Sequence, residues 1–196
     1  MSVLPPLTDE DVEQWRLWRE VALRPALQED IAKIYREIDR EIATRSPQCE
    51  ASGRCCRFNT YGHLLYVTGI EIACFLRQNE LDAECEGPLD APRPSGQKNE
   101  VSLKVLGQAE QSIDEDGKLV DGCAFQTEQG LCGAHKIRPL GCRVYYCDSE
   151  HQGWQNELYE RGLSELKTLH ERYEIPYRYM EWRVGLLEAS RCFKLQ

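Results

Sequence analysis

The stretch Cys49-Glu-Ala-Ser-Gly-Arg-Cys-Cys-Arg57 and the stretch Ile137-Arg-Pro-Leu-Gly-Cys-Arg-Val-Tyr-Tyr-Cys147 hold most of the grouped cysteines of this chain. With two further residues between them they give seven candidate ligands: Cys49, Cys55, Cys56, Cys123, Cys132, Cys142 and Cys147. A thiolate is costly to bury alone, but several thiolates can share one cation because coordination replaces lost hydration. The grouping therefore predicts a shared metal or cluster site.

The residues beside these cysteines support that prediction. The chain has 24 basic and 33 acidic residues and a net charge of -9, yet four arginines flank the cysteines: Arg54, Arg57, Arg138 and Arg143. We expect their charge to offset that of a thiolate cage. Three glycines let the backbone approach such a site, so that N–H groups can point at sulfur: Gly53, Gly133 and Gly141.

Size and composition limit the classes of protein to consider. The 196 residues are 41% hydrophobic, which predicts a single domain over 1–196 with a real core. The sequence has no apolar run of about 20 residues and no secretion signal at its start, which predicts a cytoplasmic protein without a membrane partner. The acidic balance without a basic run argues against nucleic acid. In a reducing compartment cysteines are metal ligands more often than disulfide partners; disulfides are the alternative for an exported protein.

Helical patterns lie at both ends of the chain. Residues 8–45 predict two N-terminal helices, capped at Thr8 and divided at Pro25. Trp15 and Trp18 lie three residues apart, which we interpret as core packing. Residues 154–191 predict C-terminal helices, interrupted at Pro176.

The region 46–150 is predicted to be the cysteine-cluster core. The run 64–67 predicts a short strand, Thr68 to Glu71 a capping box that begins a helix, and 82–99 a mobile loop rich in proline and charge. Alternating apolar residues over 100–121 predict a small hairpin. The expected fold is mainly α, with a cysteine-rich, loop-dominated metal-binding core and a small β-hairpin.

The spacing of the cysteines excludes several common sites. Only Cys142 and Cys147, with four residues between them, approach a zinc knuckle; the gaps of eight and nine residues around Cys132 disfavour a zinc ribbon. The arrangements of radical enzymes and of thioredoxin-like oxidoreductases are also missing. Two alternatives remain: one four-thiolate centre with three structural cysteines, which we favour, or a polynuclear site completed by His135 or His63.

These residues resemble the YkgJ-type cysteine-cluster family, which is described as a zinc- or iron-chelating domain. The resemblance covers Cys49 through Phe58 and the second block from Cys123 to Cys147, about half the chain. Ser52 stands where many members have another cysteine. The resemblance implies metal or iron–sulfur binding at all seven candidate cysteines. Some larger relatives look like the flagellin lysine N-methylase, which implies protein-lysine methyl transfer as a lesser alternative, although the glycine-rich turn of a nucleoside-binding fold is missing.

The leading hypothesis is an iron–sulfur protein with a redox, metal-handling or sensing role, with zinc competing for the same sulfurs. The second is a zinc-stapled helical module whose four tryptophans, Trp15, Trp18, Trp154 and Trp182, bind a protein partner. A third is a metal-free thiol switch with an exposed, low-pKa cysteine. No catalytic residue can be named, so whether the protein is an enzyme stays open.

Overall fold

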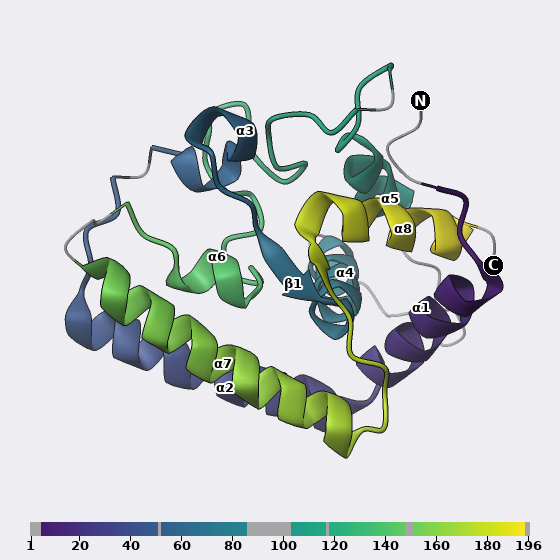
Figure 1. Ribbon diagram of the computed structural model, residues 1–196, viewed down its shortest axis with the longest axis horizontal. Helices are drawn as coiled ribbons and strands as arrows, with labels where there is room; N and C mark the ends of the chain where they lie inside the picture. Colours follow the sequence, from purple (N-terminus) through teal and green to yellow (C-terminus); the bar gives the residue numbers. More distant parts are fainter. Residues whose placement is uncertain (1–4, 51, 86–102, 117, 148–150, 195–196) are drawn as a thin grey trace.

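The computed structural model describes residues 5–50, 52–85, 103–116, 118–147 and 151–194, and this part of the chain is mainly helical (Figure 1). The helices are α1 (Asp9–Ala22), α2 (Pro25–Arg45), the 3-10 turn η1 (Arg54–Cys56), α3 (Phe58–Tyr61), α4 (Gly69–Cys85), α5 (Leu103–Glu110), α6 (Leu140–Val144), α7 (Gln152–Arg172) and α8 (Trp182–Lys194). The strands are β1 (Tyr66–Thr68) and β2 (Tyr179–Glu181).

The two predicted N-terminal helices are confirmed. Thr8 caps α1 in a capping box with Asp11, and Pro25 occupies the first turn of α2, where a missing N–H has no cost. Trp15 and Trp18 are fully buried and meet edge to face, with ring centroids 4.9 Å apart. Both tryptophans are core residues, as their spacing predicts.

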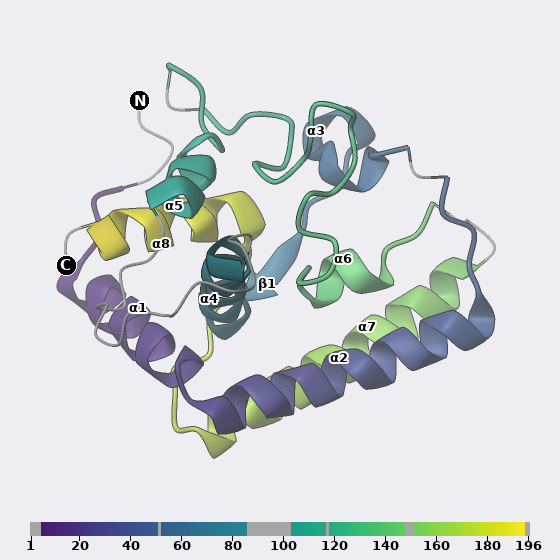
Figure 2. The same ribbon diagram turned by 180° about the vertical axis from the view of Figure 1, so that it is seen from behind.

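Long helices form one side of the molecule. In Figures 1 and 2, α2 and α7 lie side by side and antiparallel, and α4 and α8 lie nearer the centre with α1 and α5 against them. The pairing of α2 with α7 is also marked by polar contacts: Arg172 reaches Asp30 at 2.9 Å, and Arg161 pairs with Glu41. The shorter α6 packs against both long helices and carries Cys142.

The predicted hairpin over 100–121 is confirmed in its second half and wrong in its first. An antiparallel bridge joins Ile113 to Leu119, and the N–H of Val120 donates to the carbonyl of Ser112 at 3.0 Å. Residues 103–110 instead form α5, which packs against α8 and buries Ala109. An alternating apolar pattern this short fits either structure, and tertiary packing decided for the helix. The small sheet is instead the antiparallel pair of β1 and β2, with Val67 opposite Met180.

Helix α4 begins at the predicted capping box but ends later than the sequence pattern indicates. The carboxylate of Glu71 accepts from the backbone N–H of Thr68 at 2.8 Å, as a capping box requires. The helix runs on to Cys85, so residues 82–85 belong to it rather than to the predicted mobile loop; the rest of that loop lies outside the described residues. In the described ranges, no helix has both the length and the apolar content to cross a bilayer.

Candidate functional site

Two segments far apart in the sequence pair at the first cysteine cluster. The backbone N–H of Cys123 donates to the carbonyl of Cys56 at 2.8 Å, and the N–H of Phe58 donates to the carbonyl of Asp121 at 2.9 Å. An isolated antiparallel bridge lies between these two bonds. The contact therefore brings the two cysteines of η1 beside Cys123.

A tight turn after Cys123 brings in another cysteine. Gln126 bridges to Cys132, and its side-chain amide donates to the carbonyl oxygens of Gly130 at 2.9 Å and of Gly53 at 3.3 Å. Gly53 has φ +68°, and a Cβ atom there would lie 2.1 Å from the Gly130 carbonyl oxygen. Glycine is therefore required where the two cysteine segments approach each other.

The thiols of Cys55, Cys56, Cys123 and Cys132, here named the thiol cluster, are linked through Cys56. Hydrogen bonds to Cys123, Cys132 and Cys55, reinforced by burial, raise the pKa of Cys56 far above its ordinary value. The same bonds lower the pKa of Cys55 to about 6, that of Cys132 to about 7, and that of Cys123 as well. Cys56 is therefore the thiol of the cluster that keeps its proton most firmly, and its three neighbours ionise more readily than an ordinary thiol.

The other three predicted ligands differ in their relation to the thiol cluster. Burial, and then the negative charge of the cluster thiolates, raises the pKa of Cys142 well above its ordinary value, which places Cys142 within electrostatic reach of the cluster. The Sγ atom of Cys147 lies 3.9 Å from Oγ of Ser52. Cys49 is exposed. Of the seven predicted ligands, four therefore interact with one another through Cys56, and a fifth, Cys142, lies within electrostatic reach of them.

Two side chains from outside the cysteine segments act on the thiol cluster. The indole N–H of Trp182, at the start of α8, donates to Sγ of Cys123 at 3.4 Å. The positive charge of Arg138 contributes to the low pKa of Cys55 and of Cys132. The Nε atom of Arg138 is buried and has no hydrogen-bond partner within the described residues. Arg138 is therefore the arginine whose placement matches the prediction of a cation beside the thiolates.

Arg143 and Arg54 have other partners. The buried guanidinium of Arg143 pairs with Asp39 at 2.7 Å, donates to the carbonyl of Lys136 at 3.0 Å, and lies over the ring of Tyr35 at 4.2 Å. Arg54 is half exposed and pairs with Glu50. These contacts pair both guanidinium groups with carboxylates, while Nε of Arg143, like that of Arg138, is buried without a hydrogen-bond partner within the described residues.

The two candidate histidines do not contribute a nitrogen to the thiol cluster in the described structure. His135 is exposed, as expected for an ordinary loop histidine. The Nε2 atom of His63 lies 3.4 Å from the carbonyl oxygen of Cys55, and its ring stacks on Tyr145 with centroids 5.0 Å apart. Tyr145 is 40% exposed, whereas Phe58 and Phe125 are buried.

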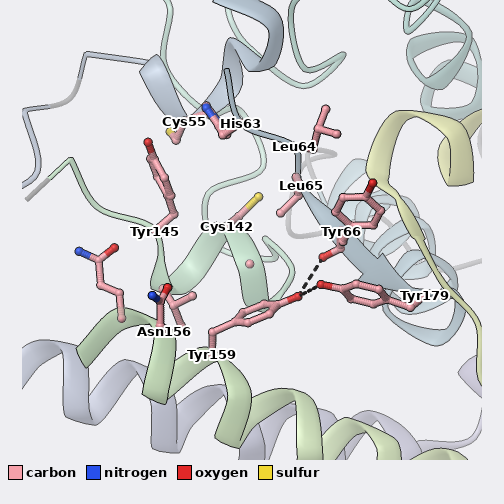
Figure 3. Close-up of a pocket in the computed structure, with 13 residues that line it drawn as sticks. Cys55, His63, Leu64, Leu65, Tyr66, Cys142, Tyr145, Asn156, Tyr159 and Tyr179 are labelled. Carbon is pink, nitrogen blue, oxygen red and sulfur yellow. Dashed lines mark hydrogen bonds between the residues drawn. The ribbon is translucent and has the colours of Figure 1, made fainter. Parts of the chain in front are cut away.

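A cavity of about 250 Å³ opens beside the thiol cluster (Figure 3). Cys55 and Cys142 both line it. Tyr159 of α7 and Tyr179 of β2 line another part, where their hydroxyl groups share a hydrogen bond. The cavity therefore gives a small molecule access to two of the candidate ligands.

Within the described ranges, no group of three or more His, Cys, Asp or Glu side chains is arranged to hold a metal ion. Comparisons with family models, curated proteins and solved structures find no match. The resemblance to the YkgJ-type family consequently stays a prediction that depends on the motifs alone.

The sequence does not identify Tyr159, Tyr179 or Trp182 as parts of this site. All three lie in the C-terminal region, where the cysteine motifs give no signal. The interruption of the helical pattern at Pro176 was the available indication, because β2 and the start of α8 follow it. Trp182 is buried, as are Trp15 and Trp18, so these three cannot form the exposed tryptophan surface of the second hypothesis.

Proposed function

We propose that this chain is a metal-binding cysteine-cluster protein whose thiol cluster holds an iron–sulfur cluster, with zinc as the competing occupant. The observation that supports it best is that Cys55, Cys123 and Cys132 interact with the buried Cys56, although the last two lie about seventy residues further along the chain. Four thiolates are the usual ligand set of both [2Fe–2S] and [4Fe–4S] clusters and of structural zinc. The proposed role is redox, metal handling or sensing.

The donor chemistry fits such an occupant. With a pKa of about 6, Cys55 is mostly thiolate at neutral pH, and Cys132, with a pKa of about 7, is thiolate in about half of the molecules; the thiolate is the form that binds metal. Cys56 would have to release its proton from Sγ when metal enters, so loading is coupled to proton release. Cys142 is the nearest additional thiol, and Cys49 and Cys147 complete the set of seven that the motif predicts.

An iron–sulfur cluster in this place would supply one-electron chemistry. The residues of the chain would control that chemistry by their own contacts. The indole N–H of Trp182 on Cys123 and the positive charge of Arg138 both stabilise negative charge on sulfur, and Phe58 and Phe125 exclude water from one side. The Trp182 donor and the Arg138 charge would favour the more negative, reduced form of the site, whereas burial against the two phenylalanines would oppose it.

The decisive experiment is anaerobic purification of the full chain with measurement of iron, zinc and acid-labile sulfide. We expect iron and sulfide together, with visible absorption that is lost on exposure to oxygen. Cys56→Ala and Cys132→Ala should abolish the iron. Cys74→Ala is the matched control, because Cys74 is buried in α4 away from the thiol cluster and should leave the iron content unchanged.

The same preparations separate the two occupants. One zinc per chain without sulfide would reject the iron–sulfur form and favour a stapling role, since zinc has no accessible redox change. Protein that carries neither metal after anaerobic purification, and takes up neither when supplied with iron and sulfide or with zinc, would reject the whole proposal.

A further inference from the structure

The size of the cavity beside the thiol cluster limits what it can bind. Pockets for drug-sized molecules have volumes of about 300–1,000 Å³. At about 250 Å³ this cavity is smaller, and it lies between α6, α7 and the strands β1 and β2 (Figure 3). A ligand of the size of one substituted ring would fill it.

The exposed apolar side chains of the molecule gather at this cavity. Eight large hydrophobic side chains are exposed in the described part of the chain, and four of the eight line it: Leu64, Tyr66, Tyr145 and Tyr179. Scattered exposed apolar residues need no explanation, but a contiguous group of them marks a binding site. Their concentration here indicates that the mouth of the cavity contacts an apolar ligand.

The charge and the rings of the lining favour a neutral, flat molecule. Within the described residues, the lining includes no Lys, Arg, Asp or Glu. Two stacked pairs of rings stand at the cavity, His63 on Tyr145 and Tyr66 on Tyr179, with centroids 5.0 and 5.3 Å apart. An anion would lose its hydration with no cation in the lining to replace it, whereas a neutral aromatic ring would find other rings to pack on.

One hydroxyl pair gives the cavity a hydrogen-bond donor. Burial is the main cause that raises the pKa of Tyr159 and of Tyr179, so both keep their protons at neutral pH. Their hydroxyl groups contact each other, and the contact from Tyr159 to the carbonyl of Tyr66 is long, at 3.5 Å. When Tyr159 donates to Tyr179, the Tyr179 proton can be donated to an oxygen of a ligand.

We propose that this cavity binds a neutral single-ring molecule with a conjugated carbonyl group, whose oxygen accepts a hydrogen bond from Tyr179 and whose ring extends toward Cys55 and Cys142. Binding depends only on the residues of the cavity. A role for this molecule as a reactant at a metal centre held by the thiol cluster rests on the function proposed above.

Calorimetric titration of the full chain with acetophenone tests the proposal, using metal-loaded and metal-free protein. Ethylbenzene has the same ring without an acceptor, and benzoate has a similar shape with a negative charge. We expect acetophenone to bind about 2- to 12-fold more tightly than ethylbenzene, the factor that one neutral hydrogen bond supplies, and at least about tenfold more tightly than benzoate.

Variants locate the binding. Tyr179→Phe should weaken the binding of acetophenone by the same factor of about 2 to 12 and leave the affinity for ethylbenzene unchanged. Asn156→Trp, at an exposed cavity position on α7, should block both neutral probes. Ser164→Trp introduces the same side chain at an exposed position on the same helix outside the cavity lining, and should leave binding unchanged.

The proposal is overturned if acetophenone does not bind, if benzoate binds equally tightly, or if the Asn156→Trp variant still binds acetophenone. It is also overturned if the cavity is occupied only by a side chain of a partner protein. Metal analysis of the same samples is a separate result. If the protein contains metal but does not bind acetophenone, only the proposed ligand site is rejected. If the protein binds acetophenone but takes up no metal, only the proposed metal-binding function is rejected.

Discussion

Apolar side chains hold the long helices together, whereas polar contacts hold the cysteine segments. In the helical frame, defined as α1, α2, α4, α7 and α8, a continuous core of tryptophan, leucine and isoleucine is buried. In the cysteine loops, defined as residues 52–61 and 119–134, backbone hydrogen bonds and the thiol cluster make most of the links between segments. Only a few residues of the loops, such as Phe58 and Phe125, reach the core.

This difference suggests how stability is divided. Burial of apolar surface is the main favourable term in folding, so the frame should be stable on its own. The loops gain little from burial and have negative sulfurs at their centre, so an occupant of the thiol cluster would stabilise them most. Mutations in the two regions should therefore have separable effects.

Trp18→Ala should have the largest effect on the frame. The Trp18 side chain is fully buried, its N–H donates to the carbonyl of Pro176 at 2.9 Å, and its ring lies directly against Gly69. Truncation of a buried aromatic residue costs about 3–5 kcal/mol. Urea unfolding followed by far-UV circular dichroism measures this loss of unfolding free energy. Leu23→Ala, at a partly exposed position, should change the unfolding free energy by less than about 1 kcal/mol, and equal losses from both would contradict a frame held by its core.

Gly53→Ala should have the next largest effect, confined to the cysteine loops. The added Cβ would meet the Gly130 carbonyl, on backbone with φ +68°. Gly62→Ala is a matched control, because Gly62 also has φ +68° but nothing within 4 Å of an added Cβ. We expect Gly62→Ala to lower the free energy of unfolding by about 1–2 kcal/mol through backbone strain alone, and Gly53→Ala to lower it by more.

Amide hydrogen exchange separates the two regions in these glycine variants. Gly53→Ala should increase exchange at residues 121–134 and leave α2 and α7 protected. Faster exchange throughout the helices, or the same cost for both glycines, would mean that the loops and the frame unfold as one unit.

The same division decides how much the sequence reveals. Helical periodicity and Pro25 predict α1 and α2 because the interactions that form them are local. The pairing of β1 with β2 joins three-residue strands more than a hundred residues apart, and no local pattern specifies that register. The motif predicts that Cys56 and Cys123 meet, but the donor from Trp182 and the cavity tyrosines come from tertiary packing of the C-terminal region, which spacing does not encode.

Arg143→Met tests the connection between the two regions. Arg143 of α6 pairs with Asp39 of α2 and is 9% exposed, so the ion pair ties the cysteine region to the frame. Loss of hydrogen bonds from a charged, buried side chain should cost about 1.5–3 kcal/mol. Arg36→Met removes an ion pair with Glu29 in which both side chains are more than half exposed, and should cost no more than about 1 kcal/mol in urea unfolding. Equal costs would show that Arg143 does not connect the regions.

Thr8→Ala should have the smallest effect and should depend on pH. Loss of the N-cap costs about 1 kcal/mol at pH 7. Hydrogen bonds from Thr8 are the main cause that lowers the pKa of Asp11 from 3.8, with Arg178 adding to it. Because the folded pKa is depressed, ionised Asp11 contributes stability that is present above pH 3.8 and lost as pH falls through the folded value. The difference between wild type and Thr8→Ala in urea unfolding should therefore shrink below that value; a constant difference from pH 7 to the acid limit would show that the cap acts without Asp11.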